Sequence, residues 1–565
     1  MISQVPWWVF SLISVVVVSA VVGGAYEDQT KVYIVYLGAV EHSHPDLVTA
    51  SHIGMLASLF GSEKDARESM IYSYRHGFSG FAAHMTDWQA RKLSGVWPES
   101  ELFNDRGLGP IPARWKGKCV DGEGFESEKH CNKKLIGARY YMQSHIQKNK
   151  TEGITSDYIE QKEFMSARDS YAHGTHVASI AGGAFVPNVS NTVFGVGTAR
   201  GGAPSARIAD GVDVMSLSLA RSIPVLPETT NDNEIIFGAF HAMSKGIPVL
   251  CASGNDGPTA YTLDNIAPWV ITVAATSLDR WFPIPLHLGN NVTILPLKLL
   301  CSQVEDPIQY LHTFSSPGVA ILAASTPSKS GAENGFITLS GTSMSTPVVA
   351  GVVALLRAIH RDWSPAAIHS ALVTTASTTD PYGEPIFADG LSGKLADPFD
   401  FGGGLVNPTK AANPGLVYDA SAEDYLRFLC ASGYEETSIG KMANRSSMYH
   451  CPSPRPSILE LNLPSITTPF LDGDVTVTRT VTNVGPIDSK YTVIVKPPLG
   501  VEITVTPNIL FFNSFVKKLS FEVTVSTTHK SNSIYYFGSI TWTDGSHFVS
   551  IPLSVRTERL MYFNH

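Results

Sequence analysis

Residues 339–360, LSGTSMSTPVVAGVVALLRAIH, form the most informative stretch of this 565-residue chain. Nearly every residue after Pro347 is apolar, which predicts a helix that is buried on all sides. Ser343 stands at its N-terminal end, where free backbone N–H groups and the positive end of the helix dipole stabilise a developing oxyanion. The alternative is a plain N-cap, because serine and threonine are favoured there for structural reasons alone.

A second stretch, VLCASGNDGP at residues 249–258, predicts a buried strand that ends in small residues. Such a strand end can present the side-chain amide of Asn255 to an oxyanion formed at Ser343. A Gly/Asn turn after a strand is the common alternative, since these residues tolerate turn conformations. Asn255 is therefore a candidate whose role depends on the other motifs.

A third stretch, SYAHGTHVAS at residues 170–179, places His173 at the start of a predicted helix, and Gly174 allows another segment to approach closely. His173 is a candidate general base. A zinc site is a poor reading, because helical two-histidine sites use i, i+4 spacing with a glutamate, and no third ligand is near. A solvent-facing histidine remains the other alternative.

Around these motifs, residues 95–419 alternate β-rich runs such as 246–254 (GIPVLCASG) with helical runs such as 233–246 (NEIIFGAFHAMSKG). This alternation predicts an α/β domain with a largely parallel sheet. From about residue 461 onward, apolar residues alternate in period two between turn signals. That pattern predicts an antiparallel β-sandwich.

The N-terminal part reads as two further segments. Residues 1–25 are apolar and end in Gly-Gly-Ala, which predicts a secretory signal peptide cut before Tyr26; an uncleaved membrane anchor is the alternative, although no basic flank follows. Residues 31–94 then give the order β-α-β-β-α, with strands predicted at 31–38 and within 70–85. This is a split βαβ unit that lacks its final strand.

The bulk composition excludes some partners. The chain is long enough for two to four domains, and its net charge of −9 gives no reason to expect a nucleic acid or an anionic membrane as partner.

Six cysteines fit an oxidising compartment. Cys119 with Cys131 and Cys430 with Cys451 are plausible bridges, Cys251 reads as a thiol in the core, and Cys301 has no obvious mate. Glycosylation sequons occur at Asn149, Asn188, Asn291 and Asn444.

Together, HGTHVAS, ASGNDGP and SGTSMSTP, in this order, resemble the subtilisin-like serine protease family. KVYIVYLG…GFSGFAAHMT resembles its inhibitory prodomain, and GVWPESELFNDRGLGPIPARWKGKC (residues 95–119) resembles the plant branch. The resemblance implies a subtilisin-like, mostly parallel sheet with flanking helices, a ferredoxin-like prodomain and a fibronectin III-like sandwich. It also implies the following boundaries: signal peptide 1–25, truncated prodomain 31–94, catalytic domain 95–455 with most of the protease-associated insertion missing, and C-terminal domain 456–557.

The resemblance also implies roles. Ser343 would be the nucleophile, His173 the base and Asn255 the oxyanion-hole amide, while Ser216, Leu217 and Ser218 would line the substrate cleft. No cofactor and no metal would be needed. The implied partners are protein or peptide substrates and the chain's own prodomain as inhibitor, with no nucleic acid and no membrane after signal removal. The implied location is extracellular, in the cell wall or apoplast.

The acid of the catalytic triad is missing from its family position. In the family an apolar strand ending in Asp-Thr-Gly or Asp-Ser-Gly precedes WPES, whereas here QARKLS (89–94) runs directly into GVWPES. Asp105, Asp169 and Asp210 lie in segments that match other family positions, so none is assigned as the acid. Two further in-frame losses fall within 201–217 and 286–325.

These observations define two hypotheses. The first is a secreted subtilisin-like serine endopeptidase that works by Ser/His acyl transfer, with low activity because the aspartate is absent. The second is a catalytically dead pseudoprotease that binds peptides or proteins. A parallel sheet that loses interior strands must also re-pair their neighbours or leave backbone groups unpaired.

Overall fold

The fold was analysed in a computed structural model of the chain. It describes residues 95–140, 166–191, 195–209, 212–220, 234–257, 262–277, 314–327, 334–380, 382–388, 394–443, 449–527 and 532–557, together with the short stretches 12–14, 31–38, 70–74, 79–85, 164, 286–287, 293–294, 301–303, 329 and 331–332. The chain divides into two compact units: residues 1–224 with 320–358, and residues 225–319 with 359–565.

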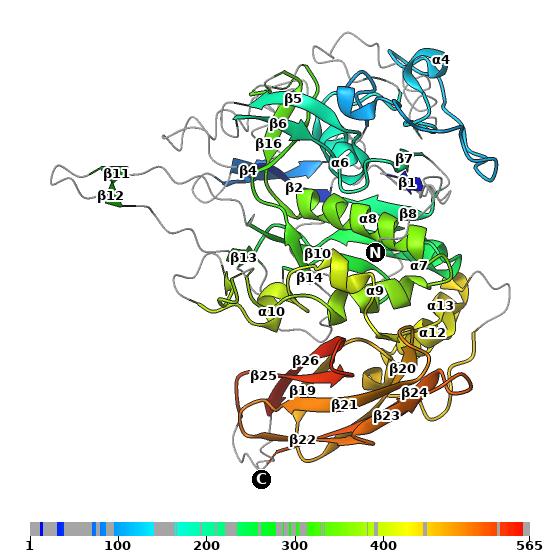
Figure 1. The fold of residues 1–565 in the computed structure, drawn as a ribbon, viewed down its shortest axis with the longest axis vertical. Coiled ribbons are helices and arrows are strands. Elements are labelled where there is room, and N and C mark those ends of the chain that lie inside the picture. The colour runs from blue at the N-terminus through cyan, green and yellow to red at the C-terminus, as the bar shows by residue number, and fades with distance from the viewer. Residues whose placement is uncertain are drawn as a thin grey trace. The chain divides into compact units, whose positions relative to one another are not determined.

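The first unit contains a set of three parallel strands. β1 (Leu12–Ser14) lies between β7 (Arg207–Ile208) and β8 (Val214–Leu217), as Figure 1 shows. The residues of β7 and β8 are mostly buried, as expected for interior parallel strands. β1 comes from the segment predicted to be a signal peptide, and that assignment stays a prediction.

Two buried helices pack in the same unit. α6 (His173–Gly182) is buried from its second residue onward, and α8 (Thr342–Ile359) follows the hairpin of β15 (Ile321–Ala324) and β16 (Phe336–Leu339). α8 has the length and apolar composition of a membrane span, but 67% of it is buried inside the protein. It is therefore the buried core helix that its sequence predicts.

Smaller elements complete this unit: η2 (Glu101–Phe103), α4 (Ser127–His130), and the hairpin of β5 (Val186–Asn191) and β6 (Gly195–Ala199). Near the N-terminus, β4 (Ser79–Met85) lies between β2 (Lys31–Gly38) and β3 (Met70–Tyr74), antiparallel to both. A third strand inserted between the first two is the arrangement of a split βαβ unit. The strands agree with the sequence; the expected helices lie outside the described residues.

In the second unit, β10 (Ile271–Thr276) pairs in parallel with β9 (Val249–Ala252) and β14 (Phe314–Pro317). The prediction of a largely parallel α/β sheet is confirmed. β13 (Cys301–Gln303) pairs antiparallel with β10 and parallel with β17 (Phe387–Ala388). The remaining elements are β11 (Leu286–His287), β12 (Thr293–Ile294), α7 (Glu234–Ser244), α9 (Pro365–Thr374), α10 (Pro398–Phe401), α11 (Pro408–Ala411), α12 (Ala422–Ala431) and α13 (Glu436–Met442).

The C-terminal part of this unit is a two-sheet sandwich. η3 (Ile458–Glu460) lies in the chain between its first strand and the others. One sheet has the order β18 (Leu416–Tyr418), β20 (Val475–Asn483), β24 (Lys518–Thr527), β22 (Val501–Thr506). The other has the order β19 (Ile466–Leu471), β26 (Phe548–Thr557), β25 (Tyr536–Thr543), β21 (Ser489–Lys496), β23 (Ile509–Phe512).

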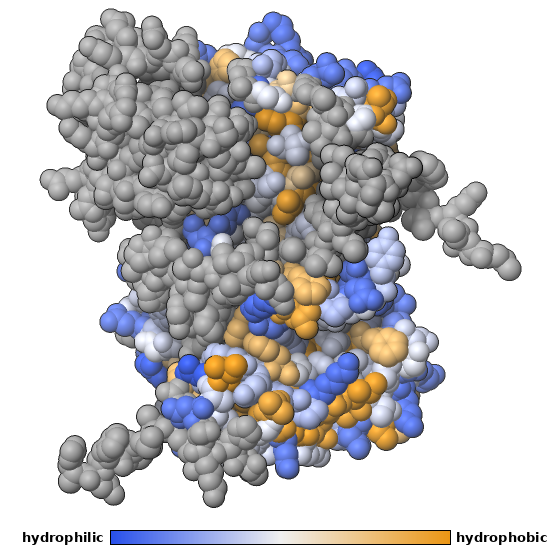
Figure 2. All heavy atoms as spheres, turned by 90° about the vertical axis from the view of Figure 1, so that its left-hand side faces the viewer, coloured by the Kyte–Doolittle hydropathy of each residue, from blue (hydrophilic) through white to orange (hydrophobic). Residues whose placement is uncertain are grey.

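The core of the sandwich is aromatic at its centre, around Tyr418, Phe521 and Trp542. Its surface, at the bottom of Figure 2, shows apolar side chains among hydrophilic ones. Phe511 and Phe515 are examples of exposed apolar residues. Single exposed apolar side chains are normal on protein surfaces.

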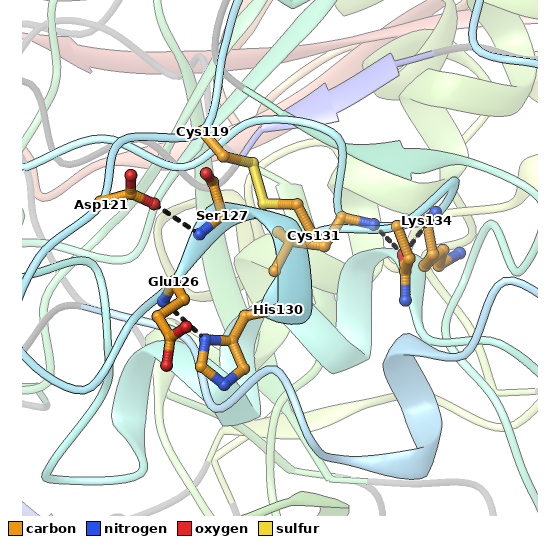
Figure 3. The surroundings of a disulfide bond; sticks show 9 residues. Cys119, Asp121, Glu126, Ser127, His130, Cys131 and Lys134 are labelled. Carbon is orange, nitrogen blue, oxygen red and sulfur yellow. Dashed lines mark hydrogen bonds between the residues drawn. A yellow bond between two sulfur atoms is a disulfide. The ribbon is translucent and has the colours of Figure 1, made fainter.

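The predictions for five of the six cysteines agree with the structure, whereas the side chain of Cys301 is not among the described ones. Cys119 bonds to Cys131, and Cys430 bonds to Cys451. Cys251 is a buried thiol in β9. Figure 3 shows the first disulfide beside α4, where the Ser127 N–H donates to Asp121 at 2.6 Å and the Glu126 N–H donates to His130 Nδ1 at 2.8 Å. The short loop is therefore fixed by both covalent and polar contacts.

Candidate active site

His173 is the first residue of α6, and a buried carboxylate holds the start of that helix. Asp169 Oδ1 accepts the N–H groups of Tyr171 and Ala172 at 2.8 and 2.9 Å. Its Oδ2 accepts the N–H and the hydroxyl of Thr175 at 2.8 and 2.6 Å. Ala172 has a φ of +73°, a left-handed conformation that needs such support. Asp169 thus anchors the start of α6. The sequence alone indicated only that it is not at the position of the triad acid.

The segment that begins at Gly95, directly after QARKLS (89–94), packs against this helix. A Cβ atom on Gly174 would lie 2.1 Å from the carbonyl oxygen of Gly95, so only glycine fits at this position. The Trp97 N–H also donates to Thr175 Oγ1 at 2.8 Å. The close approach predicted for Gly174 is confirmed.

His176, the second histidine of the motif, is a core residue. Its Nε2 lies 3.1 Å from two backbone carbonyl oxygens, those of Ile321 and Ile337. Since carbonyls only accept, Nε2 carries the proton, and the buried Nδ1 has no hydrogen-bond partner among the residues that the structure describes. Burial, with a smaller contribution from the nearby His173, lowers the pKa of His176 to about 3. His176 therefore stays neutral and joins α6 to the β15–β16 hairpin.

Ser343 is the second residue of α8 and is half-buried. It exchanges two hydrogen bonds with Ser218: the Ser343 hydroxyl donates to the Ser218 carbonyl at 3.3 Å, and the Ser218 hydroxyl donates to the Ser343 carbonyl at 2.8 Å. Ser218 directly follows β8, which carries Ser216 and Leu217. The structure therefore brings the predicted nucleophile to the end of the predicted substrate-binding strand.

The helices of His173 and Ser343 run side by side in the same direction. Near their starts, Val177 and Ile180 of α6 share a cluster with Met344 of α8. Further along, a Cβ on Gly351 of α8 would lie 2.8 Å from Gly202 Cα and 3.1 Å from the Ala181 carbonyl oxygen. Because both contacts follow the chain direction, the two N-termini lie at the same end of the pair. Their positive dipole ends therefore serve the same region.

The remaining predicted residues have different outcomes. Asn255 lies just after β9, in the second unit, so its role toward Ser343 stays a prediction. Asp105 Oδ2 accepts the Lys133 N–H at 3.0 Å. Asp210 lies outside the described residues. β1 occupies the position between β7 and β8.

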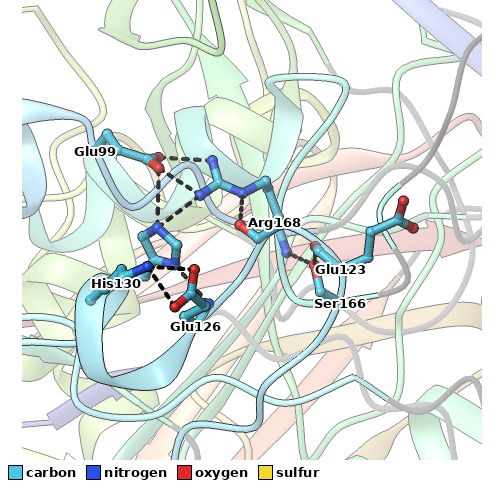
Figure 4. Close-up of polar contacts among 8 residues, drawn as sticks. Glu99, Glu123, Glu126, His130, Ser166 and Arg168 are labelled. Atoms are coloured by element: carbon cyan, nitrogen blue, oxygen red, sulfur yellow. Dashed lines mark hydrogen bonds and ion pairs between the residues drawn. The ribbon is translucent and has the colours of Figure 1, made fainter.

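A charged cluster supports the segment that leads into α6, as Figure 4 shows. Arg168 is buried, stacks on Trp97 at 4.4 Å and pairs with both carboxylate oxygens of Glu99, at 2.9 and 2.5 Å. Burial by itself would raise the pKa of Glu99, but the hydrogen bonds and positive charge of Arg168 outweigh it and lower that pKa. His130 Nε2 lies 3.5 Å from Glu99. Arg168, the residue before Asp169, thus ties the start of α6 to the segment of Trp97 and Glu99 and to His130 of α4.

An α/β fold with a histidine and a serine at the N-termini of two packed helices is the arrangement expected of a serine-dependent hydrolase. A model of the subtilase family matches residues 40–404, more than half of the chain, and a model of the fibronectin type-III domain matches residues 460–555. The chain therefore belongs to the subtilase family of serine peptidases and carries a fibronectin type-III domain.

The relatives are plant enzymes. Subtilisin-like protease SBT3.11 of Arabidopsis thaliana is 50% identical over 765 aligned positions that cover all of both chains. Subtilisin-like proteases SBT3.10 and SBT3.9 of the same plant are 42% and 41% identical, covering 95% of this chain and 96% of theirs. Among solved structures, Sphericase is 22% identical with a TM-score of 0.30, over 43% of this chain and 79% of that one.

The length of the first alignment bears on the missing segments. Its 765 positions include only 565 residues of this chain, so at least 200 positions of the relative have no counterpart here. The comparison thus agrees with the expectation of large in-frame losses.

Proposed function

We propose that the chain is a secreted serine endopeptidase whose nucleophile is Ser343 and whose general base is His173. The observation that supports this most strongly is the common end of α6 and α8, where Ser343 exchanges hydrogen bonds with Ser218. A hydroxyl at a helix N-terminus, beside a strand end and near a half-buried histidine, has what acyl transfer requires. The protein substrate follows from the subtilase family.

In the proposed reaction, the Ser343 hydroxyl leaves the Ser218 carbonyl and attacks the peptide carbonyl carbon. His173 takes the hydroxyl proton and gives it to the leaving amine, which separates as the acyl–enzyme forms. A water molecule then gives a proton to His173 and attacks the acyl carbon; the bond to Ser343 breaks, Ser343 takes that proton back, and the carboxylic acid product leaves. The Asn255 amide and the N–H groups at the start of α8 hold the oxyanion in both steps. Ser216, Leu217 and Ser218 bind the substrate along β8.

Secretion and a self-inhibiting prodomain belong to the same proposal. Two disulfides and an exposed sequon at Asn188 suit an extracellular protein, here in the plant cell wall or apoplast. The order of β2, β4 and β3 is that of a split βαβ unit, as expected for residues 31–94 as inhibitor.

Turnover is expected to be slow because the sequence provides no triad acid. Both carboxylate oxygens of Asp169, the nearest in sequence to His173, are used by donors of Tyr171, Ala172 and Thr175. In serine proteases, subtilisin among them, disabling the acid lowers kcat by about four orders of magnitude. In the Ser-His-Asp arrangement the acid holds the base in the correct tautomer and stabilises its imidazolium.

A fluorophosphonate probe tests this proposal, because it bonds covalently to an activated serine. Ser343 should be labelled, more slowly than in an intact subtilase, and labelling should disappear in Ser343→Ala and fall in His173→Ala. Ser345→Ala is the matched control, since that hydroxyl is buried and donates to the Thr342 carbonyl. Labelling at the rate of an intact subtilase would contradict slow turnover, and labelling that survives Ser343→Ala would contradict the assigned nucleophile.

The absent aspartate also favours a second candidate, a pseudoprotease that holds peptides without cleaving them. Peptide binding that depends on Leu217 and Ser218, with no product after long incubation, would support this function. Slow product formation that depends on Ser343 would exclude it.

A further inference from the structure

The three-strand set of the first unit has an unusual member. Ile13 of β1 pairs on one side with Ile208 of β7 and on the other with Val214 of β8, both in parallel. Strands in a sheet are spaced by about 4.8 Å, so β7 and β8 lie roughly 9–10 Å apart with room for one strand between them. Residues 12–14 fill that room, although almost 200 residues of sequence separate them from β7.

This position is in the interior of the unit. The other edge of β7 is already used: the Ile208 N–H donates to the Lys134 carbonyl at 2.8 Å, and the Ile136 N–H donates to the Ile208 carbonyl at 2.9 Å. Ile208, Val214 and Leu217 are buried. Backbone groups of β7 and β8 that face the central position therefore have no water to bond to, and they need a strand there.

We propose that the position between β7 and β8 is a strand-acceptor site, which the chain's own residues Leu12–Ser14 occupy while the N-terminal segment is attached. The chemistry of the occupant follows from the site: an extended, apolar, β-branched segment that runs parallel to its neighbours and contains no proline. Residues 10–19, FSLISVVVVS, have this composition. The proposal concerns the sheet and does not depend on catalysis by Ser343.

The site gives the N-terminal segment a second role. A cut before Tyr26, as predicted for a signal peptidase, would separate residues 12–14 from the chain and free the site. An extended peptide of similar composition would then bind there by adding a strand. The same segment thus couples N-terminal processing to completion of the sheet.

Cysteine cross-linking in the uncut, full-length chain tests the occupant directly. Ile13→Cys with Val214→Cys should form a disulfide, because these residues are register partners. Ile13→Cys with Leu217→Cys is the matched control, since Leu217 lies about 10 Å further along β8, too far to be bridged. Mass spectrometry of non-reduced digests should find the first cross-link and not the second. Absence of the first, or equal yields of both, would overturn the proposal.

Hydrogen exchange tests whether the site accepts a strand from outside. Ile13→Pro disrupts β1 by removing its central N–H, so the amides of Arg207, Val214 and Ser216, which face β1, should lose most of their protection. A synthetic peptide of residues 8–18 should restore it, and the same peptide with proline at position 13 should not. Unchanged protection in Ile13→Pro, or no restoration by the peptide, would contradict a strand-acceptor site. If Ile13→Pro fails to fold, the cysteine pairs still decide, because they retain β1.

Discussion

At the scale of single residues, His176 shows how burial decides the chemistry of a motif. Its Nε2–H donates to two carbonyls, and a second proton on Nδ1 would meet no acceptor in the described part of the chain. Burial lowers its pKa in the folded state to about 3, against an ordinary value of 6.5. Between these values the unfolded chain binds the proton and the folded chain does not. The stabilising contribution is therefore complete above pH 6.5 and is lost as pH falls toward 3.

We therefore expect His176→Gln to flatten the pH dependence of stability. Between about pH 4 and 6, the unfolding free energy of the wild type should rise by up to about 1.4 kcal/mol per pH unit more than that of the variant. Glutamine keeps a donor for the two carbonyls. Urea unfolding of both proteins across this range measures the difference between their slopes. Other groups titrate in the same range: burial and the charge of Asp264 raise the pKa of Asp256 to about 6, which lowers stability as pH rises. Such contributions are the same in both proteins and cancel in the difference. Equal slopes would refute the explanation.

Asp169 is the second residue whose role is structural. Asp169→Asn would place an amide N–H₂ where one carboxylate oxygen now accepts two donors, so we expect a loss of about 2–4 kcal/mol in unfolding free energy. Labelling of Ser343 should slow in parallel, because α6 loses its anchor. Thr175→Ser keeps the hydroxyl and should change little. Wild-type stability of Asp169→Asn in urea unfolding would show that the anchor is unimportant.

At the scale of elements, the placement of α6 depends on a close backbone approach. Gly174→Ala puts a methyl group 2.1 Å from the Gly95 carbonyl oxygen, and we expect it to destabilise the protein by about 3 kcal/mol as α6 shifts. Gly238→Ala is the control. Gly238 lies inside α7, and apart from its chain neighbours and the backbone of its own helix no described atom lies within 4 Å of the added methyl group, so the variant should gain about 0.5–1 kcal/mol. Thermal unfolding of both variants measures the contrast. Equal melting temperatures would contradict the close approach.

At the scale of the whole molecule, the sandwich includes more sequence than its period-two pattern indicates. β18, which precedes the predicted boundary at residue 456, pairs with β20. Leu416 and Tyr418 lie in the sandwich core. A fragment of residues 414–557 should therefore unfold cooperatively, whereas 456–557 should expose the edge of β20 and aggregate. Circular dichroism and light scattering compare them, and equal behaviour would place the boundary at 456.

The sequence by itself determined the α/β class, the sandwich, the two disulfides and the subtilase family, because these follow from periodicity, from cysteine spacing and from motif order. It also identified Gly174 as a point of close approach. Only the tertiary structure decided what Asp169 and His176 do, since their partners depend on how α6 sits against distant segments. It also placed residues 12–14 in the sheet, and no local pattern predicts this. The physical reason is common to all three: backbone hydrogen-bond groups buried by distant parts of the chain must be satisfied by whatever segment can reach them.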